Sequence, residues 1–226
     1  MNTEYNFPVS FQSIKHSFIE LSKGRTVCRL IHNYFLKSII IHKNVIDVGS
    51  RGKYSAYDFM DTSEVENIHF TDKFSNNEKI IYSDFETKIN VDDKKYDSAI
   101  LFNVLEHVEN HKNLLKEINR ILKDNGKLEL YVPFMHYYHE DPKDIFRPTH
   151  FYLEKMLKES GFECKIFTIG AGPFTVIADI ACHYLCFSIV KLSFLFLCLA
   201  LDKCRKVFSK GASRYYLGIH ASCFKK

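Results

Sequence analysis

The side chains best suited to acid–base chemistry gather in residues 133–149, which read PFMHYYHEDPKDIFRPT. An imidazole changes its charge near neutral pH, so His139 is our candidate general base for taking a proton from a hydroxyl or amine. Glu140 or Asp141 could orient that ring, and Arg147 could bind an anionic group such as phosphate or carboxylate. We therefore predict His139, Glu140, Asp141 and Arg147 as the catalytic residues.

A purely structural role is the alternative for the same segment. Asp144 stands three residues before Arg147, a spacing that favours an ion pair, and Thr149 has the side chain of a helix N-cap. The segment would then be a rigid lid. Its two histidines could also bind a metal ion together with Glu140, but we expect no metal site.

A glycine turn marks a second site. Residues 45–48, Val-Ile-Asp-Val, are typical of a buried parallel strand, and Gly49 and Gly52 follow them. Glycine adopts backbone angles closed to other residues and leaves room for a ligand against the main chain. Asp47 lies at the carboxyl end of this strand, where open α/β sheets bind their ligands.

Helices and strands alternate around both sites. Apolar residues at helical spacing predict helices over 10–37, with a break or kink at Gly24, and over 54–62, 111–123 and 149–160. Short apolar runs predict strands over 44–49, 68–72, 80–84, 96–102, 127–133, 162–169 and 215–224. This alternation is typical of an α/β fold with a doubly wound, mostly parallel sheet.

Taken in chain order, these features resemble the class I S-adenosylmethionine-dependent methyltransferases of the type 11 group. The resemblance spans about 44–170 and 215–224, and five motifs carry it: the glycine turn, Asp72, Asp84-Phe85, the segment 96–108 with its Leu-Glu-His, and the turn 122–128. It implies a methyltransferase with S-adenosyl-L-methionine as cofactor. It also implies a seven-stranded sheet in the order 3-2-1-4-5-7-6, with the last strand antiparallel.

The resemblance implies a cofactor site as well. The family's acid after the second strand, Asp72 here, binds the ribose hydroxyls, and a carboxylate can accept from both. Asp84 and Phe85 match the positions that contact the adenine. The predicted cofactor-binding residues are Asp47, Gly49, Arg51, Gly52, Asp72, Asp84, Phe85 and Asn103. The alternatives are a strand-end cap for Asp72, a solvated turn residue for Asp84, and a turn-shaping role for Glu106 and His107.

The glycine turn departs from the family's commoner form, which has glycine at Arg51 and often at Lys53. The change could weaken cofactor binding, so a catalytically silent cofactor-binding or membrane-associated scaffold protein is the alternative function. A nicotinamide dehydrogenase is disfavoured because the turn is not GxGxxG.

The distribution of charge and the cysteine pattern argue against some classes of protein. The chain has 226 residues and a net charge of +4, and residues 202–226 hold seven Lys/Arg against one acid. The basic character therefore belongs to the tail, which argues against a nucleic-acid-binding face on the domain. The seven cysteines show no CxxC pairing, so we expect reduced thiols in a cytoplasmic protein.

An apolar segment, 174–201, precedes the last expected strand and has a single fixed charge, Lys191, after Ile180. It could lie in a membrane interface beside the basic run that follows, form a buried lid or dimer face, or span the membrane. We favour the first and divide the chain into an N-terminal helical segment (1–43), a Rossmann-like domain (44–173 and 214–226) and a helical insertion (174–213).

The expected acceptor is a hydroxyl or amine of a small molecule or of a lipid- or glycan-linked molecule. The other expected partner is an anionic membrane surface, which the protein would meet peripherally through 174–213.

Overall fold

A computed structural model describes residues 2–50, 55–74, 77–140, 143–208 and 214–226 of the chain. The strands are β1 (Asn2–Glu4), β2 (Ile40–Val48), β3 (Asp61–Asp72), β4 (Ile80–Tyr82), β5 (Tyr96–Phe102), β6 (Leu122–Pro133), β7 (Phe162–Ile169) and β8 (Gly218–Lys225). The helices are α1 (Phe11–Ser22), α2 (Val27–Phe35), α3 (His111–Ile121), α4 (His150–Glu159), α5 (Pro173–Cys182) and α6 (Ser188–Phe208), with 3₁₀ turns η1 (Leu36–Ser38), η2 (Ser55–Asp58) and η3 (Leu105–His107).

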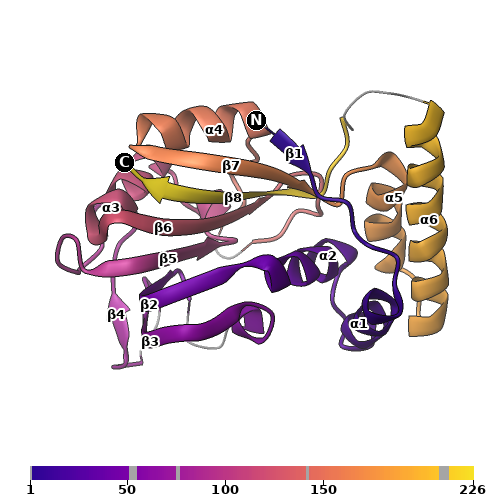
Figure 1. Ribbon diagram of the computed structural model, residues 1–226, viewed down its shortest axis with the longest axis horizontal. Coiled ribbons are helices and arrows are strands. Elements are labelled where there is room, and N and C mark those ends of the chain that lie inside the picture. The colour runs from indigo at the N-terminus through magenta and orange to yellow at the C-terminus, as the bar shows by residue number, and fades with distance from the viewer. Residues whose placement is uncertain (1, 51–54, 75–76, 141–142, 209–213) are drawn as a thin grey trace.

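All of these strands form one sheet in the order β1-β7-β8-β6-β5-β2-β3-β4 (Figure 1). Without β1 this is the predicted order 3-2-1-4-5-7-6, and β8 runs antiparallel to both β6 and β7 as expected. The predicted fold class is therefore confirmed. The sheet has eight strands rather than seven because β1 pairs in parallel with the edge of β7 that would otherwise be open.

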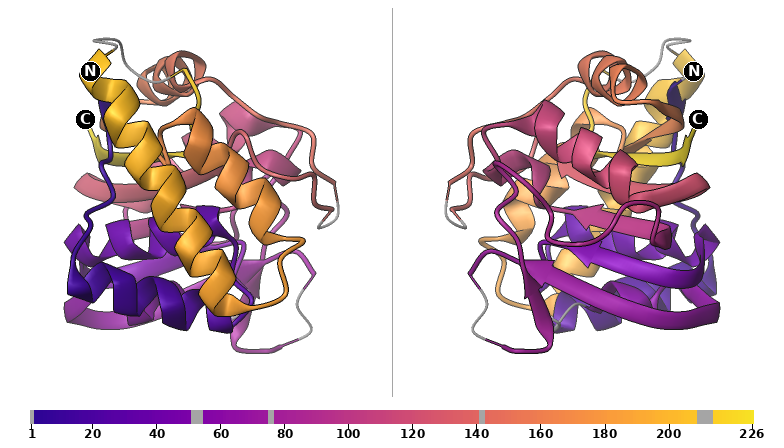
Figure 2. Two further views of the ribbon diagram at one scale, coloured as in Figure 1. Left: turned by 90° about the vertical axis from the view of Figure 1, so that its right-hand side faces the viewer. Right: turned by 90° about the vertical axis from the view of Figure 1, so that its left-hand side faces the viewer.

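Side chains alternate between the two faces of the sheet, and each face has its own helices. On β5, Ala99 and Leu101 pack in the core that α3 and α4 cover, whereas Ile100 and Phe102 pack in the core of α1, α2, α5 and α6. Figure 2 shows α5 and α6 side by side at one end of the molecule and α3 at the other. The sheet is thus covered on both faces, as a mostly parallel sheet requires.

The break expected at Gly24 is present, whereas the helix expected over 54–62 does not form in the part that is described. The expected helix over 10–37 is divided at Gly24, whose φ of +73° ends α1, and Thr26 then caps α2. The expected helix over 54–62 is wrong in the part that is described: only η2 forms, and β3 begins at Asp61. Pairing with β2 takes the last two residues of this stretch, Asp61 and Thr62, into β3, and the residues before them are too few for more than a short turn.

The expectation of reduced thiols is wrong at one pair of cysteines. Cys164 on β7 and Cys223 on β8 face each other in the antiparallel register and form a disulfide. A register that sets two β-carbons side by side is a property of the sheet, so spacing in the sequence could not reveal it.

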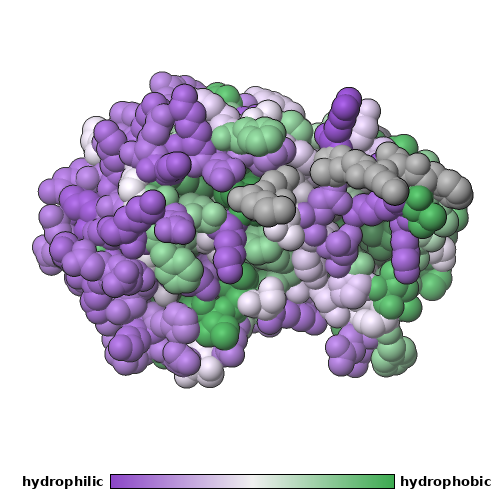
Figure 3. Space-filling view, turned by 45° about the horizontal axis from the view of Figure 1, so that its top comes forward, coloured by the Kyte–Doolittle hydropathy of each residue, from purple (hydrophilic) through white to green (hydrophobic). Residues whose placement is uncertain are grey.

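The apolar segment 174–201 supplies most of α5 and the first two thirds of α6. Part of it is core: Leu195 is fully buried and Cys198 is 2% exposed. Both helices also carry exposed apolar side chains. Figure 3 shows hydrophobic side chains gathered at the right-hand end of the molecule, which α6 forms. Among the described residues, no helix is both long and apolar enough to cross a membrane.

Candidate active site

The carboxyl ends of β5 and β6 open into a cavity of about 260 Å³. This is the edge of the sheet at which α/β folds bind ligands. Three segments supply most of its wall: the start of α2 with the turn before it, the strand ends, and the loop after β6. The side chains on this wall include Arg25, Arg29, His32, Asn103, His136 and His139.

The glycine turn lies at the same edge of the sheet. Gly49 has a φ of +81°, and a Cβ at this position would lie 2.4 Å from a methyl group of Val104. The turn therefore needs glycine both for its backbone angles and for its close packing. Arg51 and Gly52, two of the predicted cofactor-binding residues, lie outside the described residues.

Asp47 lies at the end of β2, one residue before its last residue, and its side chain is buried. It accepts a hydrogen bond from the Tyr57 hydroxyl at 2.8 Å. Burial raises the pKa of Asp47 to about 7, against the opposing effect of the bonds from Tyr57 and Ser50. A buried acid beside a tight turn fits a site in which a ligand with donor groups lies against the main chain.

The next acids lie at the ends of the neighbouring strands. Asp72, 6% exposed, ends β3 and accepts from the Phe74 N–H at 2.6 Å. Asp84 follows β4 and pairs with Lys73 at 3.0 Å, a hydrogen bond that lowers the pKa of Asp84. The side chain of Phe85 packs in the core of the α3–α4 face, so only its backbone is left to face a ligand.

Asn103, the last predicted cofactor-binding residue, is on the cavity wall with a φ of +54°. Asp47, Gly49, Asp72 and Asn103 thus lie at the carboxyl ends of three neighbouring parallel strands. This row of an acid, a tight glycine turn and a second acid fits a nucleoside-like cofactor. The individual roles stay predictions.

Of the predicted catalytic residues, His139 lies on the cavity wall, whereas Arg147 and Glu140 make contacts within the loop after β6. His139 lines the cavity, and its Nδ1 lies 3.5 Å from Asp144 Oδ2, while burial lowers its pKa. Arg147 binds Asp144 and donates to the carbonyl oxygens of the loop after β6, which is the ion pair that the structural alternative expects. Glu140 is exposed and accepts from the Tyr138 hydroxyl, and Asp141 lies outside the described residues.

A buried histidine–aspartate pair at the cavity wall was missed at the sequence level. Nδ1 of His136 lies 2.6 Å from Oδ2 of Asp179, and the two side chains are 10% and 2% exposed. Oδ1 of Asp179 accepts from the Cys28 N–H at 2.8 Å, so the acid also ties α5 to the start of α2. One signal was available: Asp179 is the only acid in the apolar residues 174–201.

A second buried chain of polar groups begins at His32, also on the cavity wall. Its Nε2 lies 3.0 Å from Nδ1 of His220, and His220 Nε2 lies 2.7 Å from Glu129 Oε2. Burial and the neighbouring imidazole lower the pKa of His32. His32 therefore presents a neutral, rigidly held ring to the cavity.

Glu106 is another buried residue that the sequence did not assign to chemistry. Its side chain is fully buried in η3, and burial raises its pKa to about 8. Among the described residues, neither of its carboxyl oxygens has a hydrogen-bond partner. A buried polar group in this state needs a physical explanation.

Comparison with known proteins agrees with this arrangement. A family model described as "Methyltransferase domain" matches residues 20–165. No curated protein matches the chain.

Several solved structures share the fold at low sequence identity. One is a chain of the complex between the Haloferax volcanii Trm112 methyltransferase activator and a methyltransferase, at 14% identity and a TM-score of 0.54, with 96% of this chain and 99% of that chain covered. Another is an Archaeoglobus fulgidus SAM-dependent methyltransferase, at 14% identity and a TM-score of 0.52, with 92% and 98% covered. A third is SpnF, a 4+2 cyclase, at 16% identity and a TM-score of 0.52, with 99% and 84% covered. Since one of these is named as a cyclase, likeness of fold leaves the reaction open.

Proposed function

The chain belongs to the methyltransferase domain family and is an S-adenosyl-L-methionine-dependent methyltransferase, and from this premise we propose that its acceptor is a hydroxyl or amine on a lipid- or glycan-linked molecule. The observation that carries the proposal is the buried His136–Asp179 pair at the wall of a small cavity.

Asp47, Gly49, Asp72 and Asn103 would hold the cofactor along the ends of β2, β3 and β5. When bound, S-adenosyl-L-methionine supplies an electrophilic methyl group. The protein's share of such a displacement is to position the acceptor and to remove its proton. Asp72 suits the ribose because a carboxylate at a strand end can accept from two adjacent hydroxyls.

We assign the general base to His136 rather than to the predicted His139. An ionised carboxylate only accepts, so the contact with Asp179 places the proton of His136 on Nδ1. Nε2 is then the basic nitrogen and can take the proton of the acceptor. Nδ1 of His139 has no hydrogen-bond partner among the described residues, so its tautomer is less well defined.

Two arginines at the cavity wall, Arg25 and Arg29, favour an anionic group next to the reacting hydroxyl or amine. Arg147 was predicted for that role, but its guanidinium is used on Asp144 and the loop carbonyls. The acceptor's reactive end would therefore carry an anion such as phosphate.

The size of the cavity and its surroundings support a large acceptor of which only one end enters. A space of about 260 Å³ is below the usual range of sites that enclose a whole small molecule. Tyr137, which lines the cavity, packs against His183, the residue directly after α5, with 4.7 Å between the centroids of the two rings. Tyr184 and Phe187, which follow, are 84% and 71% exposed, so an apolar chain could continue outward along this end of the molecule (Figure 3).

Methyl transfer to the acceptor is tested with cofactor that carries an isotopically labelled methyl group. The full-length protein is incubated with lipid and glycan extracts, and the labelled product is identified by mass spectrometry. We expect His136→Ala to lower the transfer rate by roughly 10²–10⁴-fold, the usual contribution of a general base. The exposed His42→Ala is the control and should transfer at the rate of the unchanged protein.

Two results would contradict the proposal. Failure of S-adenosylhomocysteine to bind in calorimetry would remove the cofactor site, and an unchanged rate in His136→Ala would remove the base. A labelled product without any lipid or glycan part would remove the acceptor class and leave the base standing.

The apolar end of the molecule gives a separate test of the lipid-linked acceptor. We expect the protein to float with anionic phospholipid vesicles and Phe187→Asp to float less, because the ring is 71% exposed in the connection between α5 and α6. Phe151→Asp is the matched control, since Phe151 on α4 is 74% exposed on another part of the surface. Equal flotation of both variants would argue against contact with lipid at this end.

A further inference from the structure

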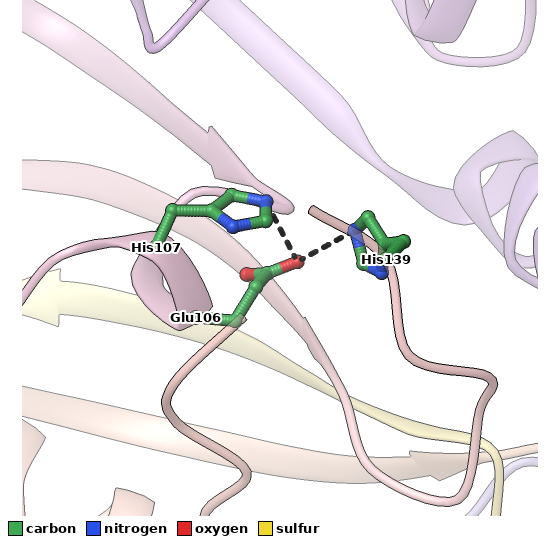
Figure 4. Close-up of side chains that lie close together, drawn as sticks. All are labelled: Glu106, His107 and His139. Atoms are coloured by element: carbon green, nitrogen blue, oxygen red, sulfur yellow. Dashed lines mark ion pairs between the residues drawn. The ribbon is translucent and has the colours of Figure 1, made fainter. Parts of the chain in front are cut away.

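Three side chains beside the cavity form a cluster that the proposed reaction does not use. Glu106 and His107 come from η3, which follows β5, and His139 comes from the loop after β6 (Figure 4). One ligand atom from each lies within 4.8 Å of the others. Oε1 of Glu106 is 3.8 Å from Nε2 of His107 and 3.8 Å from Nε2 of His139.

The two separations between Glu106 and the imidazoles are close to those between ligands of a bound metal ion. With bonds of about 2.0–2.2 Å, the ligands of a four- to six-coordinate ion lie roughly 3–4 Å apart. They are too long for hydrogen bonds, since a direct bond between these atoms would measure about 3 Å. A cation between the three atoms therefore fits better than direct contact.

The carboxyl group of Glu106 is the strongest sign of a missing partner. It is fully buried and has no hydrogen bond among the described residues. Without a partner such a group stays protonated, because an uncompensated buried carboxylate would cost several kcal/mol. A bound cation would compensate the ionised form and allow the carboxylate to act as a ligand.

The tautomer of His107 also favours a cation beside Glu106. Its Nδ1 contacts the Lys143 carbonyl oxygen, which can only accept, so Nδ1 carries the proton. Nε2 then directs a lone pair at the carboxyl oxygens of Glu106. Two acceptors that face each other need a proton or a cation between them, and a backbone carbonyl behind a histidine is a common support for a metal ligand.

Behind His139 lies a charged group in place of a hydrogen-bond partner. Asp144 Oδ2 lies 3.5 Å behind its Nδ1, and Arg147 holds Asp144 in place. A carboxylate in this position raises the basicity of the imidazole toward a metal on the other nitrogen. The loop after β6 is thus arranged to present Nε2 of His139 to Glu106.

We propose that Glu106, His107 and His139 bind a first-row divalent transition-metal ion. Two imidazoles and one carboxylate suit zinc, cobalt, manganese or iron and leave coordination positions open. Because His139 also lines the cavity, an open position would accept an oxygen of the acceptor and make its hydroxyl more acidic. This last role rests on the proposed function, whereas the metal site does not.

Cobalt(II) is the probe, because its visible absorption reports ligand number and geometry. The full-length protein is stripped with a chelator and titrated with Co²⁺ and then with competing Zn²⁺. We expect binding of about one equivalent, and binding at least about 100-fold weaker in Glu106→Gln and in His139→Ala. His42→Ala is the control, because its imidazole pairs with Glu64 at 2.7 Å on the exposed surface.

Circular dichroism melts accompany each titration. His139 is 28% exposed and lies on a loop, so His139→Ala keeps the test valid if Glu106→Gln does not fold. Absence of a cobalt spectrum in the unchanged protein would overturn the proposal, and so would unchanged affinity in folded His139→Ala. Calorimetry with S-adenosylhomocysteine separates the two ideas: cofactor binding without metal binding removes the metal site alone, and metal binding without cofactor binding removes the proposed function alone.

Discussion

At the scale of single residues, Gly49 shows how tightly the cofactor turn is built. A Cβ there would meet Val104 at 2.4 Å and force a side chain into the left-handed region of backbone space. Gly24 has a similar φ of +73°, but nothing lies within 4 Å of its Cβ position. A side chain at either position would strain the backbone, but only at Gly49 would it also overlap another residue.

We expect Gly24→Ala to cost about 1 kcal/mol of unfolding free energy, from backbone strain alone. Gly49→Ala adds overpacking and should cost about 2–4 kcal/mol in total. Urea unfolding of both variants measures the difference. Equal losses would mean that Val104 moves aside and that Gly49 is needed only for its backbone angles.

Asp47 makes a prediction about pH. Its pKa is about 7 in the folded chain and near 3.9 when unfolded, so the folded state holds the proton more strongly. Stability from this group is therefore complete below about pH 4 and is lost as the pH rises toward 7. Between pH 5 and pH 8 we expect the loss to be roughly 2–3 kcal/mol.

Asp47→Asn is the matched variant, because it keeps an acceptor for Tyr57 and has no charge. Its stability should fall less over the same pH range in urea unfolding of the cofactor-free protein. Parallel pH profiles of the two proteins would show that Asp47 stays ionised in the folded chain.

At the scale of elements, the inserted helices serve both the core and the site. Asp179 of α5 holds His136 and caps the start of α2, and Asp202 of α6 accepts from the Thr175 N–H at the start of α5 at 2.7 Å. The insertion is therefore part of the candidate active site and cannot be treated as a detachable anchor.

Two leucines on α6 test how much this helix contributes to the core. Leu195 is fully buried, whereas Leu197 is 55% exposed. We expect Leu195→Ala to cost about 2–5 kcal/mol and Leu197→Ala about 0.5 kcal/mol or less in urea unfolding. A small loss in Leu195→Ala would mean that α6 adds little to the core.

At the scale of the whole molecule, the disulfide joins β7 and β8 across 59 residues of chain that include both inserted helices. Closing such a loop restricts the unfolded chain, so we expect reduction or Cys164→Ser to lower the unfolding free energy by about 2–4 kcal/mol. Cys204→Ser, at an exposed free cysteine, is the control.

Counting thiols checks the bond itself. In denaturant without reductant, we expect five of the seven cysteines to react, since Cys164 and Cys223 are paired. Seven reactive thiols in protein purified without reductant would mean that the pair is not oxidised.

Most of the fold could be predicted because its signals are local. The strands Tyr96–Phe102 and Phe162–Ile169 have the predicted bounds, since a short apolar run between polar turns has few other stable structures. The segment after the glycine turn could not be predicted in this way. A helical pattern over so few residues is a weak signal, and pairing of β3 with β2 from Asp61 onward leaves room only for the short turn η2.

The sequence by itself determined most of the strands and the acids at their ends, because periodicity is carried by neighbouring residues, and the resemblance to the methyltransferases implied the strand order. Only the tertiary structure decided which side chains meet at the cavity. His136 and Asp179 are 43 residues apart and become a pair because α5 packs against α2. Glu106 and His139 come together because parallel strands end at one edge of the sheet, so two loops that are separate in sequence share one small space.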